Sequence, residues 1–419
     1  GRQKGGLSSF QALTTAIAAQ VGTGNIIGAC GAILLGGPGA IFWMWIIAFF
    51  GMATIYAEAV LAQETRRVAE DGSVSGGPVY YIKQAFPGRF GTFLAGFFAV
   101  ALILALGFMG CMVQSNSIGE TCAAAFGVPS WAVGIAVAVL AAVVFLGGIQ
   151  RIAGVTEKLV PVMAALYLLG GLVVLVCRVR YLPEAVGMIF RYAFAPNAII
   201  GGSLGYALKM AVSQGVKRGL FSNEAGVGSA PNAAAAASVS HPVKQGLAQM
   251  LSVFLDTLVI CSATAFLCLC SGVAPSPELK GVPYVQAALG ATFGPAGNWF
   301  ITVMTLFFAF TTILGNYYYC ESNLHYILSR EARKTELLVF RIIAVLIVFQ
   351  GARLNFSLVW DTADVTMGFM ALINLPSIVL LAKPALLALQ DYTRQRREGK
   401  DPVFHAADIG LGGKTAYWN

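Results

Sequence analysis

Two glycine-containing stretches interrupt apolar segments of the chain. The first reads AAQVGTGNIIG at residues 18–28, and no charged residue occurs between residues 8 and 57. Glycine and small polar residues form helices poorly, so we expect the helix to be broken at residues 22–25. Non-helical backbone at membrane depth is tolerated only where it is buried in protein or lines a cavity. Such a break would present amide donors and carbonyl acceptors to a small polar solute and a cation.

The backbone groups of this first break suit opposite charges. An unwound segment leaves the amides of Thr23 and Gly24 at a helix N-terminus, which suits a carboxylate. The carbonyls of Ala18 and Val21 end the preceding half-helix and suit a cation. Asn25 would lie beside the bound solute. In the alternative interpretation, Thr23 and Asn25 only hold neighbouring helices together.

The second stretch reads SNEAGVGSAP at residues 222–231. Ser222 and Asn223 precede its glycines, and we expect both to border the same solute. Glu224 is ionisable at membrane depth, which predicts a functional role. The alternative is a charge pair between Glu224 and the basic residues at 217–218. Interruptions at matching positions in two halves of a chain favour broken helices over glycine packing surfaces.

A third polar cluster lies in the sequence FFAFTTILGNYYYCE. Thr311 and Thr312 are adjacent hydroxyls, and the carbonyl of Phe308 lies one turn earlier. Together they would form a group of hard oxygens suited to a small cation such as sodium. The alternative is that each threonine bonds back to its own helix. Asn316 lies one turn beyond Thr312 on the same face, so it would border the solute. Gln114 interrupts another apolar run and must face a partner or a cavity.

Composition predicts the elements that position these groups. The chain has 419 residues, of which 57% are hydrophobic and 11% charged, whereas a soluble domain carries about 25% charged residues. We therefore expect an all-α, polytopic membrane protein with one transmembrane domain over residues 1–419. Ten apolar windows are long enough to span a bilayer: residues 8–34, 38–64, 91–120, 130–149, 157–177, 203–238, 243–271, 297–327, 335–352 and 358–389.

The two interruptions divide these spans into two halves. Residues 8–177 and 203–389 each contain five spans and begin with an interrupted helix, so the second half would enter from the opposite side as an inverted repeat. Lys and Arg concentrate on one side of this topology. The bias predicts that both ends, including a tail at residues 390–419, lie in the cytoplasm. We expect a multi-pass protein of the cell membrane, in contact with lipid.

Several other classes of protein are disfavoured. The net charge of +8 comes from basic residues between apolar spans, so a nucleic-acid partner is not expected. The eight cysteines lack a zinc-binding spacing and the three histidines lie outside span centres, so neither an enzyme nor an organic cofactor is expected. A passive channel or facilitator is an alternative, but it needs a continuous polar path. The polar residues concentrate near the midplane instead.

Several stretches together resemble the alanine/glycine:cation symporter family: SSFQALTTAIAAQVGTGNIIG, GGPGAIFWMW, DGSVSGGPVYYI, GLFSNEAGVGSAP, HPVKQGL and FAFTTILGNYYYCE. They run along nearly the whole chain. The resemblance implies sodium-coupled symport of a small neutral amino acid by alternating access, on the LeuT-type fold. Members usually carry one more helix before the ten-helix core, which implies a further helix upstream of Gly1.

The resemblance also implies roles by position. Thr23 and Gly24 would hold the substrate carboxylate, with Gln114 lining the pocket. Many members have Trp where this chain has Asn316, which implies a larger or different amino acid as an alternative substrate. Four residues would hold sodium: Ala18, Val21, Thr311 and Thr312.

Overall fold

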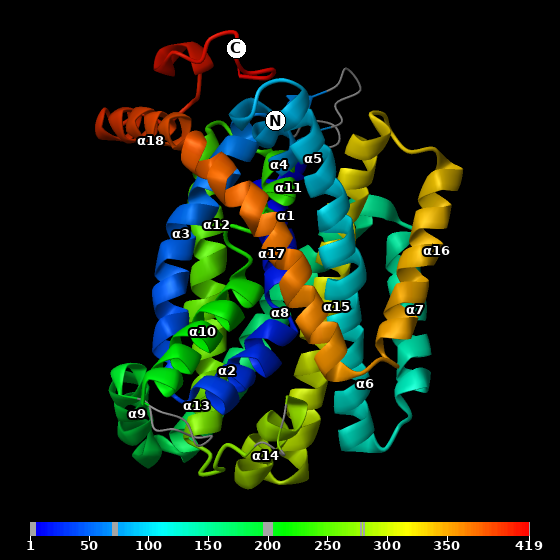
Figure 1. The fold of residues 1–419 in the computed structure, drawn as a ribbon, viewed down its shortest axis with the longest axis vertical. Helices are drawn as coiled ribbons and strands as arrows, with labels where there is room; N and C mark the ends of the chain where they lie inside the picture. The colour runs from blue at the N-terminus through cyan, green and yellow to red at the C-terminus, as the bar shows by residue number, and fades with distance from the viewer. Residues whose placement is uncertain (1–5, 69–73, 196–203, 277–278, 280, 419) are drawn as a thin grey trace.

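The computed structural model describes residues 6–68, 74–195, 204–276, 279 and 281–418. Helices make up almost all of it and run between two ends of the molecule (Figure 1). One end carries α18 (Ala382–Arg397) and the residues that follow it, and we call it the tail end. The other, called the opposite end, carries α9 (Leu182–Phe194) and α14 (Val282–Phe293).

The remaining helices follow in chain order. In the first half they are α1 (Ser9–Gln20), η1 (Gly24–Gly28), α2 (Ala29–Gly36), α3 (Ala40–Glu64), α4 (Pro78–Ala85), α5 (Arg89–Leu102), η2 (Ile103–Gly110), α6 (Cys111–Phe126), α7 (Ser130–Phe145), α8 (Gly148–Cys177) and η3 (Val179–Tyr181). In the second half they are α10 (Leu204–Asn223), α11 (Pro231–Ala236), α12 (Pro242–Val253), η4 (Phe254–Cys261), α13 (Ser262–Leu269), α15 (Pro295–Leu328), α16 (Lys334–Gly351), α17 (Phe356–Leu380) and η5 (Ala406–Ile409).

Among the described residues, six helical segments are long and apolar enough to cross a membrane, and the bent pair at the N-terminal end makes seven if counted as one span. Three of the ten predicted spans fall short of that standard. Helix α7 has only 16 residues, while α10 and α16 each carry three charged side chains. Charges are costly in a bilayer unless they face the bundle interior or reach the interface. The total of ten spans stays a prediction, and the predicted start of the second half at residue 203 lies outside the described residues.

Both predicted helix breaks are present. Helix α1 ends at Gln20 and the helix resumes with η1 and α2 at an angle of 51°. Helix α10 ends at Asn223, and α11 begins only at Pro231. The two halves interleave around these breaks, because α10 packs against α2, η1 and α3. The breaks therefore meet inside the bundle (Figure 1).

Three π-helical segments lie close to the breaks, and sequence periodicity did not predict them. Segment η1 follows the first break directly, η4 packs against η1, and η2 packs against α15. A π-helical turn widens the helix by one residue and is frequent at functional sites. The predicted unwinding of residues 22–25 is wrong in its second half, because Gly24 and Asn25 already belong to η1.

The predicted last span is too long. Helix α17 ends at Leu380, and α18 turns away from it toward the surface of the tail end (Figure 1). The first residues of α18, AKPALLALQ, are mostly apolar, which is why the predicted span extends into them. Three arginines in its last turn complete an amphipathic pattern, which is typical of a helix that lies on a surface. The predicted tail boundary at residue 390 thus falls inside α18.

The tail end is held by contacts between distant parts of the chain. Strand β1 (Leu7–Ser8) pairs in parallel with β4 (Ala237–Ser238), and β2 (Arg67–Val68) pairs with β3 (Val74–Ser75). The indole N–H of Trp418 donates to the carbonyl of Gln63 at 2.7 Å. The guanidinium of Arg66 lies over the ring of Trp418 at 4.8 Å, a favourable cation–π arrangement. The last described residues are therefore docked on the end of α3.

Candidate functional site

The first break is closed by side-chain oxygens. The amide of Gly22 donates to Asn25 Oδ1 at 2.8 Å, and the amide of Thr23 donates to Gln114 Oε1 at 3.1 Å. The expectation that the Thr23 amide would be free is therefore wrong. A buried backbone N–H needs a partner, and Gln114 on α6 reaches it from across the bundle.

The predicted cation ligands converge on one hydroxyl. Thr312 Oγ1 lies 2.9 Å from the carbonyl oxygen of Ala18, 3.3 Å from that of Val21 and 3.0 Å from that of Phe308. Thr311 Oγ1 also contacts the Phe308 carbonyl, at 3.0 Å. The structure thus brings together five oxygens, two from the end of α1 before the break and three from α15. Uncharged hard oxygens are the kind of donor that a small cation takes.

A cavity lies next to this oxygen cluster. It contains about 300 Å³ of atom-free space, and it is lined by Ala19, Gln20, Gly22, Gly24, Leu106, Gly110, Gln114, Phe221, Glu224, Thr312, Asn316 and Met367. Thr312 therefore belongs to both the cavity wall and the oxygen cluster. We call this space the central cavity. Only about 10 Å³ of it is open to the centre of a water-sized sphere, which is about the space that one water molecule needs.

Polar atoms without a partner surround the central cavity. Within the described part of the chain, Gln20 Oε1, Thr23 Oγ1 and Asn316 Oδ1 are buried and have no hydrogen-bond partner. Leaving such an atom unsatisfied is costly, about 1–3 kcal/mol each. Gln20 and Asn316 both line the cavity. Unsatisfied acceptors at a cavity wall suit a ligand that brings its own N–H donors.

The structure divides the predicted substrate residues into two groups. Gly24, Gln114 and Asn316 line the central cavity. The others lie behind its wall, where Asn25 Nδ2 donates to Asp256 Oδ1 at 2.7 Å and Ser222 Oγ donates to Asp256 Oδ2 at 2.9 Å. The predicted residues outside the cavity lining are Thr23, Asn25, Ser222 and Asn223.

Asn223 closes the start of the second break. Its carbonyl accepts from Gln20 Nε2 at 2.9 Å, and its side-chain oxygen accepts from the amide of Ala225 at 3.0 Å. Both bonds satisfy groups that the end of α10 leaves without helical partners. Asn223 therefore links the two breaks through Gln20 and holds the cavity wall.

The charge-pair alternative for Glu224 is wrong. Lys217 Nζ and Arg218 Nη2 both contact Asp364 Oδ2 on α17, at 2.6 and 3.0 Å. Glu224 instead accepts a hydrogen bond from the hydroxyl of Ser229, and it lines the central cavity. The basic residues lie one or two turns earlier on α10, on a face that is directed toward α17.

Sequence reasoning missed several functional positions. Gln20 is a polar residue directly before the break, and that position could have been noticed. Asp256 joins the two breaks through Asn25 and Ser222, and nothing in the apolar run around it indicates that bridge. The apolar lining residues Leu106, Phe221 and Met367 carried no signal, because an apolar residue that faces a cavity looks like one that faces lipid.

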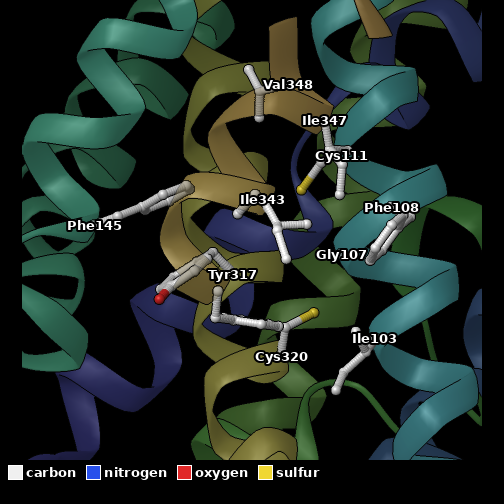
Figure 2. A pocket seen from close by; sticks show the side chains of 12 residues that line it. Ile103, Gly107, Phe108, Cys111, Phe145, Tyr317, Cys320, Ile343, Ile347 and Val348 are labelled. Atoms are coloured by element: carbon white, nitrogen blue, oxygen red, sulfur yellow. The ribbon is translucent and has the colours of Figure 1, made fainter. Parts of the chain in front are cut away.

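A second cavity is apolar and lies apart from the breaks. Figure 2 shows it between η2, α7, α15 and α16, with the thiols of Cys111 and Cys320 among aliphatic side chains. The ring of Tyr317 stacks on Phe145 with centroids 4.0 Å apart, and its hydroxyl contacts Arg341 Nε at 3.3 Å. This cavity offers apolar contact rather than recognition of a polar solute.

A larger hollow opens at the tail end, with about 1540 Å³ of atom-free space that includes open solvent. We call it the vestibule. Its lining ranges from the exposed basic side chains of Arg67, Lys83 and Arg330 to the buried side chains of Asn232 and Tyr318. Asn232 lies on the first turn of α11, directly after the second break. The vestibule therefore extends from solvent to the second break.

The chain has the LeuT-type fold. A manganese transporter from Eremococcus coleocola superposes with a TM-score of 0.61 at 13% identity, covering 94% of this chain and 81% of that one. MhsT, solved in complex with L-phenylalanine, superposes with a TM-score of 0.59 at 15% identity, covering 94% and 90%. At these identities the likeness concerns the fold alone. The predicted LeuT-type, all-helical class is confirmed.

The chain belongs to the sodium:alanine symporter family, whose model matches residues 1–406. It is 43% identical to the putative sodium/proton-dependent alanine carrier protein YrbD of Bacillus subtilis, over 97% of this chain and 85% of the relative. It is also 43% identical to the probable sodium/glutamine symporter GlnT of Bacillus subtilis (96% and 82%) and to the sodium/alanine symporter AgcS of Methanococcus maripaludis (90% and 83%). The chain is thus a multi-pass membrane transporter of an amino-acid-carrier family, and the predicted family is confirmed.

Proposed function

We propose that this chain couples the inward movement of sodium to the uptake of a small neutral amino acid. The observation that carries the proposal is the contact between two features. The central cavity is bordered by unsatisfied acceptors, and the five-oxygen cluster adjoins it through Thr312. A zwitterion and a small cation would be bound side by side.

Each end of the zwitterion has a matching group. Asn316 Oδ1 and Gln20 Oε1 would accept hydrogen bonds from the ammonium group. The substrate carboxylate would displace Gln114 Oε1 and reach the Thr23 amide between Gly22 and Gly24, which line the cavity. The start of η1 favours negative charge there. Because the substrate would replace Gln114 at this amide, the contacts that close the first break would differ between the empty and the substrate-bound site. Relatives are named for alanine and for glutamine. The size of the substrate side chain that the cavity accepts is therefore the property that the competition experiment must determine.

Sodium would bind at the carbonyls of Ala18, Val21 and Phe308 with the hydroxyls of Thr311 and Thr312. The Thr312 hydroxyl would turn its proton away and offer its oxygen to the ion. Because Thr312 also borders the cavity, sodium would fix the wall against which the substrate packs. Coupling follows, since each ligand improves the site for the other.

Orientation is part of the proposal. The tail end carries the basic residues of the vestibule and the arginines of α18, which favours a cytoplasmic position. The vestibule would then be the exit to the cytoplasm.

Transport in proteoliposomes tests this function directly. With the full chain reconstituted, an inward sodium gradient should drive accumulation of radiolabelled alanine above equilibrium, and unlabelled glycine, serine and glutamine should compete to different extents. Uptake that never exceeds equilibrium would favour the passive facilitator instead. Thr312→Ala should weaken apparent sodium affinity by at least about tenfold, because a hydrogen-bond-like contact to a charge is worth roughly 1.5–3 kcal/mol.

Thr305→Ala is the matched control. Its hydroxyl donates to the Ile301 carbonyl within the same helix, two turns before Thr312. Sodium affinity should be unchanged in that variant. Equal affinities in the wild type and Thr312→Ala would contradict the assignment of the ion site.

A further inference from the structure

Three carboxyl groups are buried around the second break. The exposed fractions are 0% for Glu58, 4% for Glu224 and 0% for Asp256. Among the described residues, none of the three lies within ion-pair distance of a Lys, Arg or His nitrogen; the nearby Lys217 and Arg218 contact Asp364 instead. An isolated ionised carboxylate in an apolar interior is so costly that the group takes up a proton instead.

The neighbours of Glu224 are acidic or neutral on every side. Glu58 on α3 and Asp256 on η4 interact with it, as does the phenol of Tyr319 on α15. Glu58 accepts from the amide of Gly226 at 3.2 Å and from Asn374 Nδ2 at 2.5 Å. The hydroxyl of Tyr81 on α4 donates to the same Asn374, so that side of the cluster is neutral. Like charges that interact in one buried site disfavour one another's ionised form.

Glu224 differs from the other two carboxyl groups in its position. It lies in the break itself with a left-handed backbone (φ 55°), and it lines the central cavity together with Thr312. A cation arriving at the oxygen cluster would face this carboxyl across the same cavity. An approaching positive charge favours the ionised form of a carboxyl group.

A short polar path joins Glu224 to the tail-end solvent. Glu224 accepts from the hydroxyl of Ser229, and the carbonyl of Ser229 accepts from Asn232 Nδ2 at 2.7 Å. Asn232 lines the vestibule. The Ser229 hydroxyl is therefore the first group between Glu224 and the vestibule, and the next residue on that side, Asn232, already borders open space.

We infer that Glu224 is a proton-binding site that opposes the cation site: the carboxyl is protonated while the oxygen cluster is empty and releases its proton when sodium binds. The step is a simple exchange, in which the O–H bond of the carboxyl breaks and the proton leaves by way of Ser229 to water in the vestibule. Glu58 is a positioning residue, since it holds the Gly226 amide and so fixes the break. The inference rests on the proposed sodium site.

The test measures protons rather than substrate. Purified full-length protein in weakly buffered detergent with a pH-sensitive dye should release protons when sodium chloride is added, but not when choline chloride is added. Apparent sodium affinity should weaken as pH falls, by at most about tenfold per pH unit for exchange with one proton. In E224Q both the release and the pH dependence should disappear while sodium still binds.

E120Q is the matched control, because Glu120 is a half-buried carboxyl on α6 outside the cavity lining. It should behave as wild type. No sodium-dependent proton release from the wild-type protein overturns the inference, whether or not E224Q folds, and so does equal release from E224Q. Alanine uptake is measured separately, so loss of uptake with intact proton release would refute the proposed symport alone.

Discussion

Each helix break leaves backbone groups without helical partners inside the bundle, and the two breaks satisfy those groups with different chemistry. The first spans about one turn and is closed by neutral groups, namely the side-chain oxygens of Asn25 and Gln114 and the hydroxyl of Thr312. The second runs from Glu224 to Ala230 and depends on left-handed residues and on the buried carboxyl group of Glu58, which holds the amide of Gly226.

This difference separates two roles. Neutral oxygens can turn from a backbone donor to a ligand at little cost, so the first break is suited to exchange one partner for another. A buried carboxyl group that holds a backbone amide is hard to replace, so Glu58 fixes the shape of the second break while Glu224 carries the proton. The comparison predicts that replacing a glycine of the first break will impair transport, and that replacing a left-handed glycine of the second will lower stability.

The largest effect is expected at Gly22. A Cβ there would overlap Thr312 Oγ1 and lie 3.0 Å from Gln114 Oε1, which displaces both partners of the first break. Gly22→Ala should lower sodium-driven uptake by at least about 100-fold, as misplacement of a site by roughly 1 Å can do. Gly31→Ala is the control, because a Cβ there meets nothing within 4 Å. Near-normal uptake by Gly22→Ala would remove the first break from the transport site.

At the second break, Gly228→Ala should act on stability. The residue has φ 89°, and a Cβ would lie 2.7 Å from Phe98 Cζ and 3.1 Å from Asn374 Cγ. Strain and overpacking each cost about 1–3 kcal/mol, so thermal unfolding in detergent should occur at a clearly lower temperature. Gly127→Ala separates backbone strain from overpacking, because Gly127 has φ 67° but an added Cβ would meet nothing within 4 Å. If both variants melt alike, packing at the second break contributes nothing.

A selectivity change is expected at Asn316, on the wall of the central cavity. Asn316→Trp would fill volume in the cavity, so competition should shift toward glycine and alanine over larger amino acids. The shift should be on the order of tenfold, because differences of about one methylene in a pocket are worth roughly 1–3 kcal/mol. An unchanged ranking of competitors would mean that the residue does not border the substrate.

The smallest effect is expected at His241, where stability should depend on pH. This dependence must be distinguished from the proton release proposed for Glu224. His241 caps α12 at the tail end, with Nδ1 accepting from the Val243 amide and Nε2 facing Asp391. Burial lowers the pKa of His241 below its ordinary value, despite the opposing influence of Asp391. The stability that this neutral histidine provides is present above its ordinary pKa, near 6.5, and is lost as pH falls below it toward the depressed value.

His241→Gln removes that titration. Its melting temperature should change less than that of the wild type between about pH 7 and pH 5, the range below the ordinary histidine pKa. Sodium-dependent proton release should be the same in both. A wild-type melting temperature that is flat over this range would contradict the role of His241.

Local sequence predicted the breaks and could not predict their partners. Gly22 and Gly226 stand among apolar residues, and that contrast is visible in a single window. The bond from Thr23 to Gln114 and the bridge from Asn25 to Asp256 join residues 91 and 231 positions apart. No local pattern specifies such pairs. The α17–α18 boundary was missed for a related reason, since an apolar half-face looks the same on a surface as in a span.

The contact of the C-terminal tail with α3 has a consequence for the order in which the protein folds. The hydrogen bond from Trp418 to Gln63 joins residues 355 positions apart. Closing a longer loop adds little entropy cost, because that cost grows only logarithmically with length. The contact nevertheless requires the helices in between to be in place, so it forms late in assembly. Protection of the tail from added protease would therefore report that assembly is finished, and would serve as a folding check for every variant named above.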